Sequence, residues 1–238
     1  MSEHHSPRVA LVDFGLGNLH SVLRACEGAG LSAAITDKKA DVLAADAVLL
    51  PGVGAFGDAM KNLKAADLVG PLRALHAAGR PIIGICLGLQ LLMQESEEFG
   101  HHAGLGLIEG TVVRFRSPRD AAHRELKVPH VSWSRVQRPR PSVAKTADPW
   151  SGTPLDGLRD GTHMYFVHSY YVCPTDPRVR LSMTQYGDVE FCSSVRSGNT
   201  IAFQFHPEKS GAEGQRIYRQ IASFIEQCRL HKDVKNAC

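Results

Sequence analysis

The sequence lacks the patterns that mark several large classes of protein. It contains no long run of basic residues, and its formal net charge is only +3 over 238 residues, so charge gives no argument for a nucleic-acid partner. No apolar stretch is long enough to cross a membrane, because glycines interrupt the longest one. The N-terminal residues lack the charged and then apolar layout of a secretion signal, and we therefore expect a cytoplasmic protein with no membrane or nucleic-acid partner.

Cysteine is scarce as well, and its six positions follow no recognisable pattern. There is no Cys-x-x-Cys pair and no histidine at zinc-ligand spacing, so no metal site is predicted. We expect reduced thiols, several of them buried. Cys86 is the exception that needs an explanation, because it lies between Gly84 and Gly88 in the run Gly-Ile-Cys-Leu-Gly.

What the sequence does contain is enough apolar material for one sizeable domain, since 43% of its residues are apolar and 21% are charged. In the first hundred residues, short apolar runs alternate with helical segments. Strands are predicted at 8–13, 32–36, 47–50 and 81–85, and helices at 18–30, from 58 onward, at 71–78 and directly after Cys86. This alternation predicts an α/β fold with an open, mostly parallel, twisted sheet flanked by helices.

The second half changes character, because strand-like runs follow one another with turn residues between them. These runs lie at 110–115, 130–136, 163–172, 179–186, 190–198 and 199–206. They predict an antiparallel ribbon added to the same sheet, and apolar residues at helical spacing predict a closing helix at 211–229. We expect one domain over residues 1–238, with frayed tails at 1–7 and 230–238 and surface insertions at 116–125 and 138–153.

Cys86 follows a predicted buried strand and precedes a predicted helix. A sharp turn at this point pushes the thiol out above the carboxyl edge of the sheet, and the helix N-terminus favours the reactive thiolate. The same turn explains the flanking glycines, since side chains there would press on the strand and the helix. The N–H of Leu87 is then placed to bind a developing oxyanion. Taken alone, a buried packing cysteine explains this motif equally well.

A second motif, His206-Pro207-Glu208, follows the last predicted strand. A nucleophilic thiol needs a base, and the base needs a group that fixes its tautomer and orientation. His206 is the candidate base and Glu208 the candidate orienting group. An isolated histidine at a strand end is more often structural, but the two motifs support each other because both lie where strands end.

A third motif is the glycine-rich loop Pro51-Gly52-Val53-Gly54, which follows the third predicted strand. Its backbone N–H groups can point into a cleft at the carboxyl edge of the sheet. A phosphate-binding loop of the Walker type does not fit, because the Gly-Lys-Ser/Thr ending is absent. A second oxyanion donor or a substrate cradle fits better, with plain turn chemistry as the alternative.

Together the three motifs resemble those of the class I (triad) glutamine amidotransferases, which have a flavodoxin-like fold. Segments over nearly the whole chain narrow the resemblance to the glutaminase subunits of imidazole glycerol phosphate synthase, from histidine biosynthesis. These segments are 13–22, 50–60, 84–92, 127–133, 165–171 and 204–211. That family usually has Gly-Trp-Asn after its Pro-His, where this chain has Ser132-Trp133-Ser134.

The resemblance implies roles for individual residues in the hydrolysis of L-glutamine. The implied catalytic residues are Cys86, His206 and Glu208. The implied oxyanion and substrate-binding residues are Gly52, Val53, Gly54, Leu87, Gln90, His168, Ser169 and Tyr170. For His168 and Tyr170, packing within an aromatic strand is the alternative. No metal and no organic cofactor is implied.

The resemblance also implies a separate partner, a cyclase subunit with a (β/α)₈ barrel that receives ammonia and makes imidazole glycerol phosphate and aminoimidazole carboxamide ribotide. Trp133, Tyr165 and Lys209 are the candidate interface residues of this heterodimer, although each can equally be core or solvated surface. Three other functions remain open: the glutaminase subunit of another amidotransferase, a cysteine hydrolase of similar fold, and a binding subunit without the chemistry. The presence of all three triad residues argues against the last.

Overall fold

The computed structural model of the chain describes residues 6–140 and 148–236, and within these ranges the main sheet has 11 strands. They are β1 (Arg8–Val12), β2 (Ser32–Thr36), β3 (Ala47–Gly52), β4 (Ile82–Cys86), β5 (Met93–Ser96), β6 (His102–Ala103), β7 (Ile108–Arg114), β10 (Tyr170–Pro174), β11 (Arg180–Tyr186), β12 (Val189–Ser197) and β13 (Thr200–Phe203). A separate antiparallel ribbon consists of β8 (His130–Val136) and β9 (Thr162–His168).

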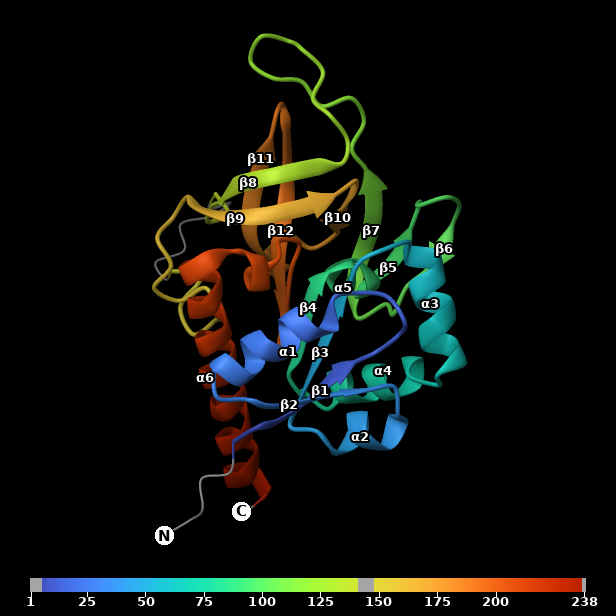
Figure 1. Cartoon of the computed structure of the whole chain (residues 1–238), viewed down its shortest axis with the longest axis vertical. Coiled ribbons are helices and arrows are strands. Elements are labelled where there is room, and N and C mark those ends of the chain that lie inside the picture. Colours follow the sequence, from blue (N-terminus) through green and yellow to red (C-terminus); the bar gives the residue numbers. More distant parts are fainter. Residues whose placement is uncertain (1–5, 141–147, 237–238) are drawn as a thin grey trace.

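The main sheet has a parallel half and a mostly antiparallel half (Figure 1). The parallel half has the order β2-β1-β3-β4-β13, and β4 lies between β3 and β13. Beyond β13, the strands β12, β10 and β7 pair antiparallel, β11 pairs with β12, and β5 and β6 form the far edge. The predicted fold class, a mostly parallel sheet with an antiparallel addition, is confirmed.

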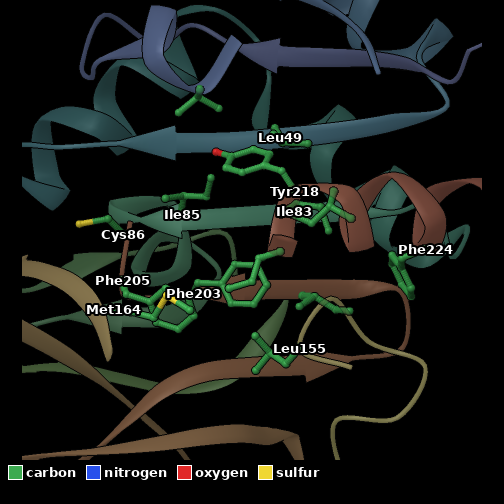
Figure 2. Packing of buried hydrophobic residues seen from close by; sticks show 14 of the residues in the cluster. Leu49, Ile83, Ile85, Cys86, Leu155, Met164, Phe203, Phe205, Tyr218 and Phe224 are labelled. Carbon is green, nitrogen blue, oxygen red and sulfur yellow. The ribbon is translucent and has the colours of Figure 1, made fainter. Parts of the chain in front are cut away.

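Helices cover both faces of the parallel half. α1 (Leu19–Gly28) and α6 (Gly211–Asn236) cover one face, and α2 (Lys39–Ala44), α3 (Phe56–Ala65), α4 (Val69–Ala77) and α5 (Leu87–Leu91) cover the other. Successive residues of β3 point to opposite sides, so Leu49 packs in the cluster of α6 and Leu50 in the cluster of α3. Figure 2 shows the first of these clusters. Within the described ranges, no helix is long and apolar enough to cross a membrane.

The segment after Cys86 differs from the prediction, because its helix ends at Leu91 and β5 follows. The backbone carbonyls of Leu91 and Met93 accept hydrogen bonds from Leu105 and Gly106, at 2.8 and 3.0 Å, instead of continuing a helix. β5 pairs with β7 and β6. These long-range hydrogen bonds override the helical propensity of a segment rich in glutamate.

Other boundaries also differ from the sequence prediction. The strand predicted at 163–172 is two strands, because the chain leaves the ribbon after His168 and enters the main sheet at Tyr170. The last predicted strand ends at Phe203, three residues before His206. The closing helix continues to Asn236, so 230–236 is helical where a frayed tail was expected, whereas 1–5 and 237–238 lie outside the described residues. The short elements α2 and β6 were not predicted.

The two predicted insertions connect strands of the sheet and the ribbon. Residues 116–125 belong to the loop that extends from the end of β7 at the top of Figure 1. Within this loop Arg119 and Glu125 form an isolated antiparallel bridge. The second insertion, 138–153, follows β8, and its residues 141–147 lie outside the described ranges.

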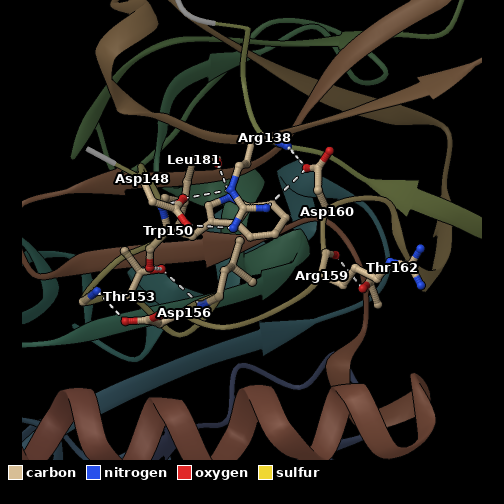
Figure 3. A network of polar contacts seen from close by, with 11 residues as sticks. Arg138, Asp148, Trp150, Thr153, Asp156, Arg159, Asp160, Thr162 and Leu181 are labelled. Atoms are coloured by element: carbon tan, nitrogen blue, oxygen red, sulfur yellow. Dashed lines mark hydrogen bonds and ion pairs between the residues drawn. The ribbon is translucent and has the colours of Figure 1, made fainter. Parts of the chain in front are cut away.

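Trp150 fixes the second insertion to the body of the protein (Figure 3). Its indole is fully buried, and its Nε1 donates to the carbonyl of Leu181 at 2.8 Å. The guanidinium of Arg138 lies 3.9 Å from the ring centroid and donates to both carboxylate oxygens of Asp148, at 2.8 and 2.7 Å. Arg138 also lies 3.6 Å from Asp160. This cluster holds the end of the ribbon at which β8 finishes and β9 begins.

Trp150→Ala should lower the free energy of unfolding by about 3–5 kcal/mol, because it leaves a large cavity under the insertion. Trp150→Phe should cost less, because it keeps most of the buried ring and loses only the Nε1 hydrogen bond. Urea unfolding followed by circular dichroism measures both values. Equal stability of Trp150→Ala and the wild type would show that the insertion is not anchored by this residue.

Candidate active site

Cys86 lies on a strained turn between β4 and α5. Its backbone has φ 53° and ψ −107°, a conformation that residues other than glycine rarely adopt. The two flanking glycines permit the turn, as the sequence predicts. A Cβ on Gly88 would lie 1.6 Å from the carbonyl oxygen of Leu50, and a Cβ on Gly84 would lie 2.8 Å from the Cβ of Ala202. Gly88 therefore lets the helix approach β3, and Gly84 leaves room on β4 for the helix backbone at Gly88 and for Ala202 of β13.

The turn places the Cys86 side chain at the edge of the apolar core. Figure 2 shows it at the end of β4, with its sulfur pointing away from the packed residues. The residue is only 5% exposed. Its Sγ lies 3.9 Å from the carbonyl oxygen of Val167 on β9 and 3.7 Å from Nε2 of Gln204. The sulfur is thus enclosed by polar groups from the ribbon and from the end of β13.

His206 and Glu208 lie directly after β13, at the short 3₁₀ helix η2 (Pro207–Lys209). His206 Nδ1 and Glu208 Oε1 are 2.7 Å apart, and both side chains are only 4% exposed. Among the described residues, Nε2 of His206 has no hydrogen-bond partner within normal geometry. Burial lowers the pKa of His206, but the charges of the nearby Cys86 sulfur and the Glu208 carboxylate outweigh it and raise the pKa to about 10. The ring is therefore held by one nitrogen, and the other is available to the sulfur.

A pocket of about 270 Å³ opens beside the Cys86 sulfur. Its walls come from four separate parts of the chain: the loop after β3, the turn at Cys86 with α5, the segment after β5, and the ribbon. The lining residues are Val53, Gly54, Cys86, Leu87, Gln90, Glu98, Pro129, Val167, His168, Ser169 and Tyr170. Most of the residues proposed from the sequence thus line one pocket. Gly52, His206 and Glu208 are not among the lining residues, and Gly52 packs against Phe14 and Leu87.

Glu98 lines the same pocket and was missed by the sequence analysis. It lies two residues after β5, and its Oε2 accepts a hydrogen bond of 2.6 Å from the backbone N–H of Phe56. Burial raises the pKa of its carboxyl, and the bond from Phe56 acts in the opposite direction. No local pattern indicated it, because the run Glu95-Ser96-Glu97-Glu98 is typical of the solvated face of a helix.

Trp133, Tyr165 and Lys209 do not line the pocket, but they form a cluster on the outer side of the ribbon. Trp133 and Tyr165 face each other across β8 and β9, with ring centroids 6.1 Å apart. The Lys209 ammonium lies 5.7 Å from the centroid of the Tyr165 ring. Trp133 is 52% exposed, and its neighbour Val131 is also exposed. The cluster lies close to the candidate triad, because the Tyr165 carbonyl accepts from the N–H of His206 at 2.9 Å.

No metal centre is evident within residues 6–140 and 148–236, where no group of three or more His, Cys, Asp or Glu side chains could hold an ion. The side chains of Gln90, Glu98 and His168 in the pocket each bond to a backbone group. The arrangement is therefore a thiol with an imidazole and a carboxylate beside a small polar pocket. It can perform acyl transfer from an amide or ester to the thiol.

Cys86→Ala should lower the pKa of His206, because the charge of the sulfur is the largest influence that raises it. In the wild type the imidazolium should persist at pH 8, two units below the midpoint of about 10. Nuclear magnetic resonance titration of the His206 ring nitrogens measures both midpoints. Cys173→Ala, at an exposed cysteine of β10, is the matched control. An unchanged midpoint in Cys86→Ala would contradict the pairing of the two groups.

Comparisons with known proteins identify the family. Residues 10–223 match the family model of glutamine amidotransferase class-I. The chain is 46% identical over 213 residues to the imidazole glycerol phosphate synthase subunit HisH of Syntrophotalea carbinolica, covering 90% of this chain and 98% of that protein. It is 45% identical to the subunit HisH of Rhodopirellula baltica, covering 90% and 97%.

Solved structures share the fold. A glutamine amidotransferase superposes with a TM-score of 0.67 and 20% identity, covering 92% of this chain and 98% of that one. The structure of PurLQS from Thermotoga maritima gives a TM-score of 0.64 at 18% identity, covering 93% and 100%. The chain therefore belongs to the class-I glutamine amidotransferase family, and within it to the HisH subunits of imidazole glycerol phosphate synthase.

Proposed function

We propose that this protein is a glutaminase subunit that hydrolyses L-glutamine to glutamate and ammonia for imidazole glycerol phosphate synthesis in histidine biosynthesis. The observation that carries the proposal is the combination of Cys86 on its strained turn with a buried His206, whose Nδ1 is held by Glu208 at 2.7 Å. The relatives named as HisH subunits supply the biological context. We further propose that the enzyme acts in the cytoplasm.

The reaction follows from the positions of these groups. The Cys86 thiolate attacks the carbon of the glutamine side-chain amide, and the carbonyl oxygen becomes an oxyanion. His206 gives its proton to the amide nitrogen, ammonia leaves, and a γ-glutamyl thioester remains on the sulfur. His206 then accepts a proton from a water molecule that attacks the thioester. Glutamate leaves, and both Cys86 and His206 return to their starting states.

The pocket residues supply binding and electrostatic stabilisation in this proposal. The backbone N–H of Leu87 and an N–H of the loop at Val53 and Gly54 stabilise the oxyanion, a contribution worth roughly 10²–10³ in rate for one donor. The carboxylate of Glu98 offers the pocket a negative charge for the α-ammonium of the substrate. Gln90 and the backbone of 168–170 complete the binding site.

We also propose that the ammonia passes to a cyclase subunit with a (β/α)₈ barrel. The relatives are named as subunits of a synthase, which supports a complex of this kind. The outer side of the ribbon fits the interface, because Val131 and Trp133 are more than half exposed and Lys209 lies over the ring of Tyr165, the partner of Trp133 across the ribbon. A docked partner would cover this surface next to the candidate triad and keep ammonia out of the solvent.

Cys86→Ala should abolish glutamine-dependent synthesis by the complex while synthesis from added ammonium salts continues, because only the glutaminase step needs the thiol. Coupled assays of the copurified complex with each nitrogen source measure this split. Cys173→Ala should retain both activities, since its thiol lies on an exposed part of β10. Glutamine turnover that is absent from the wild-type complex, or that survives in Cys86→Ala, would refute the proposed function.

Trp133→Ala should weaken binding of the cyclase subunit by about 2 kcal/mol, roughly thirty-fold in Kd, as expected for an aromatic anchor. Leu230→Ala is the matched control, because Leu230 is exposed to a similar extent on α6. Isothermal titration calorimetry of the two variants gives both constants. Equal affinity of Trp133→Ala and wild type would place the interface elsewhere.

A further inference from the structure

Gln204 is a buried amide that none of the chemistry above uses. It is completely shielded from solvent, and it follows β13 two residues before His206. Its Nε2 lies 3.7 Å from the Cys86 sulfur, and its Oε1 lies 3.2 Å from Nε2 of Gln90. The side chain thus connects the candidate nucleophile to a wall of the substrate pocket.

The orientation of this amide is determined by the carbonyl of Tyr170. A backbone carbonyl can only accept hydrogen bonds, so the Gln90 atom 3.0 Å from it must be the donor Nε2. The second hydrogen of the same Nε2 then donates to Gln204, whose atom at that position must be the acceptor Oε1. The Gln204 atom that remains, an N–H donor, necessarily faces the Cys86 sulfur. The Tyr170 carbonyl, acting through Gln90, therefore determines that Gln204 presents a donor to the nucleophile.

The Tyr170 carbonyl is itself anchored from the ribbon. Nδ1 of His168 lies 2.8 Å from it and must be protonated, again because the carbonyl only accepts. His168 Nε2 lies 3.1 Å from Nδ1 of His130, and both rings are buried. Burial lowers the pKa of His130 to about 4, and burial with the charge of His130 lowers the pKa of His168 to about 3. Both rings are thus neutral near pH 7, so His168 Nε2 accepts and His130 Nδ1 donates.

The outer end of this hydrogen-bond network consists of two serines. Nε2 of His130 must accept, and the hydroxyls of Ser132 and Ser134 each lie 2.9 Å from it and 2.9 Å from each other. The His130 ring is held between Tyr186 and Phe166, with centroids 4.0 and 5.2 Å away.

We propose that Gln204 is a further catalytic residue, an amide that donates to the Cys86 sulfur, and that His130 is the positioning residue that anchors its hydrogen-bond network from the ribbon. A donor at the sulfur stabilises the thiolate relative to the thiol. The network also orients Gln90 and the Tyr170 carbonyl, which both line the pocket. The proposal rests on the proposed glutaminase function for its kinetic consequences, whereas its effect on the thiol can be measured without any turnover.

The first experiment measures the reactivity of the Cys86 thiolate. Alkylation by iodoacetamide is followed from pH 5 to pH 10 by mass spectrometry of the peptide that carries Cys86. In Gln204→Met the pH profile of the alkylation rate should move toward higher pH by about one unit, and the rate at high pH should equal that of the wild type, because the thiolate loses a hydrogen-bond donor. Gln204→Glu keeps the side-chain volume and removes the N–H donor, so its alkylation profile should shift in the same direction. This variant replaces Gln204→Met in the experiment if Gln204→Met does not fold.

Gln185→Met is the matched control, because Gln185 is an exposed glutamine on β11 whose side-chain amide donates to the backbone carbonyl of Gly187. Its alkylation profile should equal that of the wild type. Identical profiles for wild type and both Gln204 variants would overturn the role of Gln204. If the profiles shift but the wild-type complex shows no glutaminase activity, the proposed function fails and the assignment of Gln204 stands.

The second experiment tests His130. Nitrogen-15 spectra of the wild type should show His130 and His168 as neutral rings with the proton on Nδ1, and a proton on Nε2 of His168 would overturn the network. In the copurified complex, His130→Leu should raise KM for glutamine about ten-fold with a smaller change in kcat, as for loss of one buried hydrogen bond. His130→Asn offers an N–H near the position of Nδ1, so its KM should lie within about three-fold of the wild-type value. Equal losses in both variants would show that only ring packing matters.

Discussion

The close approach of α5 to β3 is the constraint on which the candidate site depends. The carbonyl of Leu50 occupies the space that any side chain at Gly88 would need, so the helix starts immediately against the sheet. The chain then turns within one residue, and Cys86 takes a backbone conformation that is costly for a residue with a Cβ. That turn sets the direction of the sulfur at the end of β4. The neighbouring strand β13 delivers Gln204 and His206 to the same edge of the sheet.

The β8–β9 ribbon completes the site from outside the main sheet. Its inner residues His130 and His168 reach the pocket wall through hydrogen bonds, and its outer residues carry the exposed cluster around Trp133. The backbone of Tyr165 forms hydrogen bonds with His206 and Ser210. These bonds join the outer surface of the ribbon directly to the candidate triad. A partner that presses on the ribbon therefore acts on elements bonded directly to the pocket. The ribbon is held at its other end by Trp150 and Arg138.

Local sequence was sufficient for the parallel strands and for the turn at Cys86, because buried strands are apolar runs and tight turns require glycine. It failed where hydrogen bonds between distant segments decide the structure. The segment after Leu91 has the composition of a helix, yet its carbonyls bond to the 104–106 backbone, and Glu98 consequently reaches the pocket. Gln204 was overlooked because one polar residue between two phenylalanines reads as the solvent side of a strand, whereas here it is buried.

The sequence by itself determined the family resemblance, the chemical types at the site and the order in which strands deliver them. Those properties depend on short motifs whose residues are adjacent in the chain. Only the tertiary structure decided which groups share one pocket, which nitrogen of each imidazole is protonated, and which atom of Gln204 faces the sulfur. The protonation states and the amide orientation follow from one hydrogen-bond network. At the pocket it joins residues about 80 or more positions apart in the sequence, and at its outer end it lies within the ribbon. Hydrogen-bond polarity is a property of the whole network, so no single segment can specify it.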